Sequence, residues 1–138
     1  MGAEAVLTAS SDSDLQPRDL ARLASDAAWE RNATDPVAID VSGRLPLTDA
    51  FLLVSGSSER NVIAIADAVD ERLAEHGVAL KRREGKGSGR WELLDFGDLI
   101  VHVFHEEDRA YYALERLWRD CPVLPLPERV ASGDASRS

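Results

Sequence analysis

The chain contains little of what marks several large classes of protein. Among its 138 residues there is one cysteine, aromatic residues make up 6%, and no run of 18 uninterrupted apolar residues occurs. A lone Cys121 excludes an intramolecular disulfide and a zinc site built from thiolates, and it fits a reducing compartment. Since the chain has neither a long apolar run nor a basic leader, we expect no membrane span and no secretory signal. We therefore expect a cytoplasmic protein.

Positive charge is also scarce. The sequence has 16 Lys and Arg against 25 Asp and Glu, a formal net charge of -9. General binding to phosphate backbones is disfavoured, because Lys and Arg are needed to displace condensed counterions. Simple solubility explains an acidic balance equally well, so only local clustering of charge is informative.

Basic residues are missing entirely from Trp91 through Asp108. Two apolar runs in this segment flank Gly97-Asp98, and Gly at the first of two loop positions is typical of a type II′ hairpin. The segment therefore predicts two paired strands, and a partner that docks there should be positively charged. Its six carboxylates are Glu92, Asp95, Asp98, Glu106, Glu107 and Asp108.

Helical and strand patterns alternate along the rest of the chain. Apolar spacing predicts helices over 17–31 and 57–77 and a last helix from Glu106 that ends before Pro122. Apolar or β-branched runs predict strands over 37–41, 51–55 and 78–82. This order predicts one α/β domain over 17–120, a mixed β-sheet flanked by helices. Residues 1–16 and the Pro-rich 121–138 are predicted to be flexible tails. The second helix should bury Val62, Ile65, Ala66, Val69 and Leu73.

Tyr112 stands out in the last predicted helix, because it projects nearly opposite to the apolar stripe. Single aromatic side chains often lie along a protein surface with the hydroxyl hydrated. The alternative is an anchor for a partner protein. The sequence leaves both possibilities open.

Three segments together resemble the ribosomal silencing factor family, RsfS, also called Iojap. They are Thr48-Asp49 before a strand, Gly56 through Asp67, and Trp91 through Trp118, in the family's order and spacing. The resemblance covers about residues 17–119. Two departures are Asn61, where the family often has His, and an unusually basic insert before Trp91.

The resemblance implies a small α/β protein, similar to nucleotidyltransferases in fold, that is not an enzyme and uses no cofactor. It implies docking on the fourteenth protein of the large ribosomal subunit, which blocks joining of the small subunit and lowers translation when nutrients are scarce. Carried over by position, the implied anchors are Trp91 and Tyr112, and the surrounding contact residues are Leu94, Asp95 and Asp98.

A nucleotide-binding enzyme is the first alternative, because Gly56-Ser57 at a strand-to-helix turn is similar to the phosphate-gripping motif of nucleotidyltransferases. Two-metal chemistry needs acids that converge within a few ångströms. Asp95 and Asp98 instead straddle a turn. No metal site is expected, since His102 and His105 are three apart on a strand and tend to face opposite sides.

The glycine-rich stretch 85–89 lacks the spacing of a phosphate-binding loop and is predicted to be a flexible connection. Basic residues around it are candidates for contact with ribosomal RNA phosphates, with a solvated loop as the alternative. They are Lys81, Arg82, Arg83, Lys86 and Arg90. A further alternative for the apolar hairpin is a homodimer interface unrelated to the ribosome.

Overall fold

The computed structural model describes residues 15–112, 116 and 119–126, and of residues 110–112 only the backbone. The helices of this part are α2 (Pro17–Glu30), α3 (Glu59–Glu75) and α4 (Glu106–Tyr112). The strands are β1 (Thr34–Asp40), β2 (Ala50–Gly56), β3 (Arg82–Glu84), β4 (Trp91–Asp95), β5 (Leu99–His105) and β6 (Val123–Leu124).

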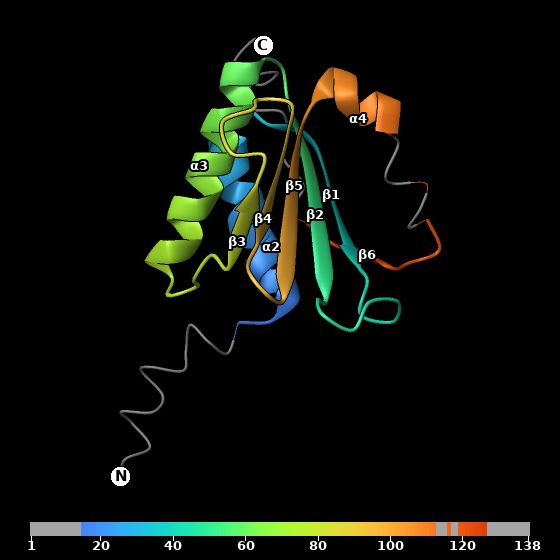
Figure 1. Ribbon diagram of the computed structural model, residues 1–138. Coiled ribbons are helices and arrows are strands. Elements are labelled where there is room, and N and C mark those ends of the chain that lie inside the picture. Colours follow the sequence, from blue (N-terminus) through green and yellow to red (C-terminus); the bar gives the residue numbers. More distant parts are fainter. Residues whose placement is uncertain (1–14, 113–115, 117–118, 127–138) are drawn as a thin grey trace, which may run out of the picture.

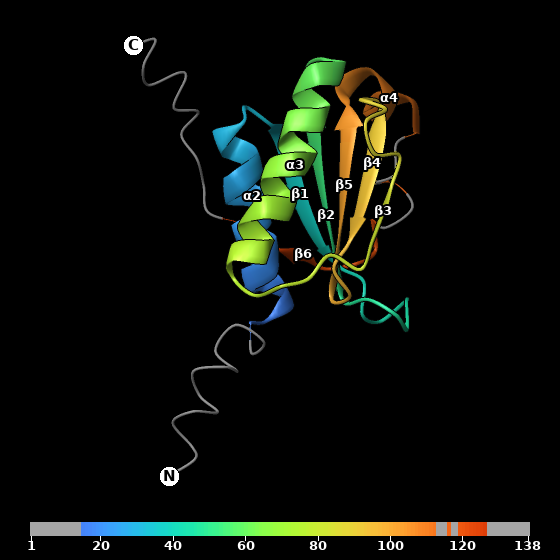
Figure 2. The same ribbon diagram turned by 60° about the vertical axis from the view of Figure 1, so that its left-hand side comes forward.

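The strands form one mixed sheet in the order β3-β4-β5-β2-β1-β6. β2 and β5 are parallel, and the other neighbouring strands are antiparallel. Helices α2 and α3 lie side by side on one face of the sheet, while α4 lies on the other side, at the end of β5 (Figures 1 and 2). The predicted α/β architecture is confirmed.

The main core fills the space between the sheet and the helices α2 and α3. Helix α3 buries the five residues expected from its apolar spacing, Val62, Ile65, Ala66, Val69 and Leu73. Its start is capped by the Ser58 side chain, which accepts a hydrogen bond from the Asn61 backbone N–H. The chain leaves the helix through Gly77 at a φ of 79°, a conformation that glycine adopts without strain.

The opposite side of the sheet carries a smaller apolar cluster, and we call this side the open face. Strand alternation places there every second side chain of β1, β2, β4 and β5. Its buried or half-buried residues include Ile39, Phe51, Leu53, Trp91, Ile100, His102 and Phe104. Among the described residues, α4 is the helix on this side, and it contacts β5 and β2.

Two sequence predictions differ from the structure. The strand expected over 78–82 begins only at Arg82. Arg82 pairs with Asp95, the last residue of β4, so the residues before Arg82 have no strand to pair with. Val123 and Leu124 form β6, which pairs with Ile39 and Ala38 of β1. The domain thus extends beyond residue 120, where the sequence predicted its end. Most of the predicted tails, residues 1–14 and 127–138, lies outside the described residues.

Candidate functional site

The hairpin that joins β4 to β5 turns at Gly97-Asp98, as the sequence predicted. Gly97 has a φ of 95°, while Asp98 does not have a positive φ, which is the backbone pattern of a type II′ turn. Phe96 N–H donates to the Leu99 carbonyl at 2.9 Å. The Asp95 carboxylate accepts the Gly97 N–H at 2.8 Å and so holds the turn in place.

Strand β4 presents different residues to the two sides of the sheet. Trp91, Leu93 and Asp95 alternate onto the open face and are half-buried, whereas Glu92 and Leu94 point toward the helices and are fully buried. The open face therefore carries one aromatic, one aliphatic and one acidic side chain of this strand.

Trp91 belongs to an aromatic cluster on the open face. Its indole Nε1–H donates to His102 Nδ1 at 3.2 Å, and its ring lies 4.9 Å from the ring of Phe104. The ring of Phe51 meets His102 edge-on at 4.9 Å. Burial lowers the pKa of His102 to about 4, so this histidine is neutral at neutral pH and accepts the indole hydrogen bond.

One of the six hairpin carboxylates belongs to the interior. Glu92 is completely buried and receives hydrogen bonds from Arg83 at 2.6 and 3.2 Å and from the Gly87 N–H at 3.0 Å. Arg83 also pairs with Asp67 of α3 at 2.9 Å. Burial lowers the pKa of Arg83, but its hydrogen bonds to Glu92 and Asp67 outweigh that effect and raise the pKa. Glu92 is therefore a structural acid.

Two further carboxylates, at the start of α4, are paired with Arg90. The Arg90 guanidinium forms two hydrogen bonds of 3.0 Å to Asp108 and one of 3.3 Å to Glu107. It also lies 3.6 Å from Glu59 of α3. Asp95, Asp98 and Glu106 form no ion pair with the described part of the chain. The folded hairpin is thus less uniformly acidic than its sequence.

Comparison with known proteins agrees with the resemblance seen in the sequence. Residues 14–138 match the family model described as ribosomal silencing factor during starvation, RsfS. The chain belongs to the ribosomal silencing factor family. The ribosomal silencing factor of Halalkalibacterium halodurans is 42% identical over 79% of this chain and 93% of its own length. That of Bacillus subtilis is 38% identical over 81% of this chain and 95% of its own.

The fold agrees with a solved structure as well. A crystal structure of a Chromobacterium violaceum protein superposes with a TM-score of 0.73 at 35% identity, and it covers 75% of this chain and 87% of that one. For this silencing-factor family member, both the family and the α/β fold predicted from the sequence are confirmed.

The five predicted contact residues do not share one surface. Trp91 and Asp95 lie on the open face, and Asp98 is exposed at the turn. Leu94 is wrong as a direct contact, because its side chain is sealed in the main core against the helices. Tyr112 is the last residue of α4, and its side chain lies outside the described part of the structure. Trp91, Asp95, Asp98 and Tyr112 therefore stay predictions.

Two open-face residues were missed by the sequence reasoning. Leu93 and Ile100 are half-buried beside Trp91 and His102, on paired strands. The signal was available, since Leu93 is two residues from Trp91 and strand alternation places both on one face.

The basic residues around the glycine loop also divide into two groups. Arg83 and Arg90 are engaged with carboxylates, Arg83 with the buried Glu92 and Arg90 with Asp108. Their contact with RNA phosphates stays a prediction. Arg82 pairs with Glu84 at the surface, and Lys81 and Lys86 are exposed. The loop itself is tied down by the bond from Gly87 to Glu92. A side chain at Gly85 would collide with the Trp91 carbonyl.

The strand-to-helix turn at Gly56-Ser57 and the helix α3 that follows it have structural contacts. Asp67 and Asp70 of α3 both face Arg83. Gly56 lies so close to α3 that an added Cβ would stand 2.9 Å from Val62 Cγ2. Across the described residues, no three His, Cys, Asp or Glu side chains are grouped to hold a metal ion. Likewise, no described helix has the length and apolar character needed to cross a membrane.

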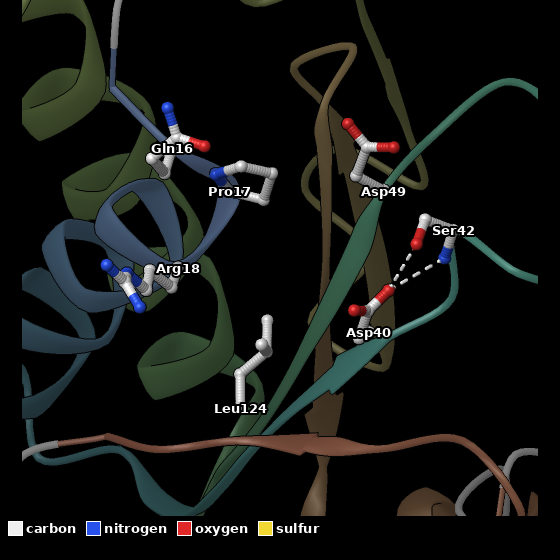
Figure 3. A pocket seen from close by; sticks show the side chains of 7 residues that line it. All are labelled: Gln16, Pro17, Arg18, Asp40, Ser42, Asp49 and Leu124. Atoms are coloured by element: carbon white, nitrogen blue, oxygen red, sulfur yellow. Dashed lines mark hydrogen bonds between the residues drawn. The ribbon is translucent and has the colours of Figure 1, made fainter.

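A hollow of about 470 Å³ lies away from the open face, between α2 and the ends of β1 and β2. Figure 3 shows Asp40 at its wall, bound by the Ser42 hydroxyl at 2.6 Å and backbone N–H at 2.9 Å. These bonds lower the pKa of Asp40. Its carboxylate therefore serves to fix the turn after β1. The other lining residues are Gln16, Pro17, Arg18, Asp49 and Leu124.

Proposed function

We propose that this protein is a ribosomal silencing factor that binds the large ribosomal subunit through its fourteenth protein. Occupying that protein would block joining of the small subunit and repress translation under nutrient limitation. The single observation that carries the proposal is the half-buried Trp91 on a sheet face that α2 and α3 leave uncovered.

The chemistry of the open face supports a protein partner. Trp91, Leu93 and Ile100 supply a partly exposed apolar surface, and aromatic anchors of this kind dominate the energy of many interfaces. Asp95 and Asp98 add carboxylates that form no ion pair with a described Lys or Arg. Ribosomal proteins are generally basic, so charge complementarity would steer the encounter while the apolar residues hold the complex.

The size of the hairpin is compatible with one interface. Trp91 and Asp95 stand at opposite ends of β4, about 13 Å apart at the usual rise per strand residue. A standard interface buries about 800 Å² per partner, which is roughly 28 Å across. A single docked protein would therefore reach both the aromatic end and the acidic turn.

Trp91→Ala tests the anchor. We expect binding to purified large subunits to weaken by about 30-fold, the equivalent of about 2 kcal/mol for a truncated anchor. Co-sedimentation with a dilution series of subunits measures it. Trp29→Ala is the matched control, because Trp29 is also half-buried but lies on α2, on the other side of the sheet.

Equal binding by the Trp91→Ala variant and the parent, both folded, would remove Trp91 from the interface. A subunit-joining assay tests the mechanism, and we expect 70S formation to fall as the protein is added. Light scattering of the free chain addresses the alternative. Self-association that Trp91→Ala abolishes, without binding to large subunits, would favour a homodimeric module. Nucleotide turnover by the purified chain would instead favour the nucleotidyltransferase alternative.

Contact with ribosomal RNA, if it accompanies docking, should come from the exposed cations Lys81, Arg82 and Lys86. Each lost phosphate contact reduces the slope of log affinity against log salt by about 0.7 to 0.9. Lys86→Ala should therefore flatten the salt dependence of large-subunit binding. Arg83 and Arg90 are committed to carboxylates and serve the fold.

A further inference from the structure

His102 is a polar side chain buried in an aromatic cluster, which lowers the stability of the fold. It lies among Phe51, Trp91 and Phe104, and its ring stacks at 10° to the ring of Phe104. Its Nδ1 accepts the Trp91 indole hydrogen bond, so Nε2 carries the proton of the neutral ring. That Nε2 is buried without a hydrogen-bond partner. A buried donor left unpaired lowers stability.

A phenylalanine at this position would keep the aromatic packing without the unpaired donor. The property that histidine alone adds is the acceptor for the indole of Trp91. Trp91 is half-buried, and its ring is tilted by 34° against the ring of Phe104. Because a hydrogen bond is directional, the bond to His102 selects the orientation in which the indole N–H points at that histidine.

We propose that His102 is a positioning residue for the docking surface, which holds Trp91 in the orientation that meets the partner. The inference rests on the proposed function, because it requires Trp91 to be an anchor. Its physical basis is preorganisation: a side chain already fixed in its bound orientation loses less conformational entropy on binding. Burial, which keeps His102 neutral at neutral pH, maintains the acceptor.

Two substitutions separate positioning from packing. His102→Phe keeps a ring of similar size and removes the acceptor, whereas His102→Asn places an amide oxygen near the position of Nδ1. We expect His102→Phe to unfold at the same denaturant concentration as the parent or a higher one, and to bind large subunits about three- to tenfold more weakly. His102→Asn should bind more tightly than His102→Phe, even if it is less stable.

A double-mutant cycle shows whether His102 acts through Trp91. On the Trp91→Ala background, His102→Phe should cause no further loss of binding. An equal loss on both backgrounds, or parent-like binding by His102→Phe, would overturn the proposal.

The free protein provides a readout that does not depend on the ribosome. The indole N–H resonance of Trp91, assigned with Trp91→Phe, should shift and exchange faster with solvent in His102→Phe. An unchanged resonance would mean that the hydrogen bond does not hold the ring, and would overturn the proposal. If the parent chain does not bind large subunits, the proposed function fails and so does the docking role of His102. The indole resonance then still reports whether the hydrogen bond exists.

Discussion

The two faces of β4 carry residues of similar type, but those on one face are fully buried and those on the other are half-buried. On the helix side, Glu92 and Leu94 are fully buried, with the carboxylate matched to Arg83. On the open face, Trp91, Leu93 and Asp95 are half-buried and border a surface that α2 and α3 do not cover. Acid and leucine thus occur on both faces, one set for the fold and the other for a proposed partner.

The contrast shows that a count of charges along a segment does not describe a surface. The hairpin has six carboxylates and no base in its sequence, yet Arg83 and Arg90 arrive from outside the segment and pair with three of them. The acids left for long-range attraction are those at or near the turn and Glu106. Substitutions on each face test this division between structural and surface acids.

The largest effect should come from Arg83→Met. This change leaves the buried Glu92 carboxylate without its cation, and breaking a buried pair in this way costs about 3–5 kcal/mol. Denaturant unfolding followed by circular dichroism measures it. Arg82→Met is the matched control, since the Arg82–Glu84 pair is exposed and should contribute less than about 1 kcal/mol. Similar losses from both would contradict a structural role for the Arg83–Glu92 pair.

Neighbouring leucines offer the next comparison. Leu94→Ala opens a cavity in the main core and should lower the free energy of unfolding by about 3 kcal/mol. Leu93→Ala on the open face should lower it by about 1 kcal/mol and should weaken large-subunit binding more than its stability loss suggests. The division of β4 into two faces would be refuted if Leu93→Ala proved the more destabilising of the two.

Acid should weaken the fold through His102. Its folded pKa of about 4 lies below the ordinary value of 6.5, so between these pH values the unfolded chain binds a proton that the folded chain does not. Stability should therefore fall as pH drops through this window, by up to about 3 kcal/mol. Urea unfolding of the parent and His102→Phe at pH 7 and pH 4.5 measures the difference. The stability of His102→Phe relative to the parent should be greater at pH 4.5 than at pH 7. An equal difference at the two pH values would rule out this contribution.

The smallest effect is expected from Asp98→Lys. The Asp98 backbone carbonyl, not its side chain, accepts bonds from the Asp49 and Ala50 N–H groups, so stability should change by less than about 0.5 kcal/mol. Association with large subunits should slow several-fold at low salt and recover as salt screens the charge. Stopped-flow measurements at two ionic strengths test this. A defect that persists at high salt would point to a direct contact instead of steering.

The parts of the fold that could be predicted are those with local causes. The buried stripe of α3, its Ser58 cap and the Gly97 turn follow from spacing and backbone preference over a few residues. The strand β6 could not be predicted, because two residues between prolines carry no periodicity and become a strand only by pairing with β1. The candidate site divides in the same way. Trp91 was named as a contact from the family resemblance and stays a prediction, Leu94 was named as a contact although it is buried in the main core, and His102 was not connected to Trp91.

The class of fold, the family and the position of the hairpin could be predicted from the amino-acid sequence, because periodicity, turn chemistry and motif spacing are properties of neighbouring residues. Contacts between distant segments set which acids remain at the surface, which leucine of β4 lies on the open face and which residue accepts the hydrogen bond of the tryptophan. Those outcomes depend on residues from separate strands and helices that meet only when the chain folds, and burial then sets whether a charge must be paired or can face a partner.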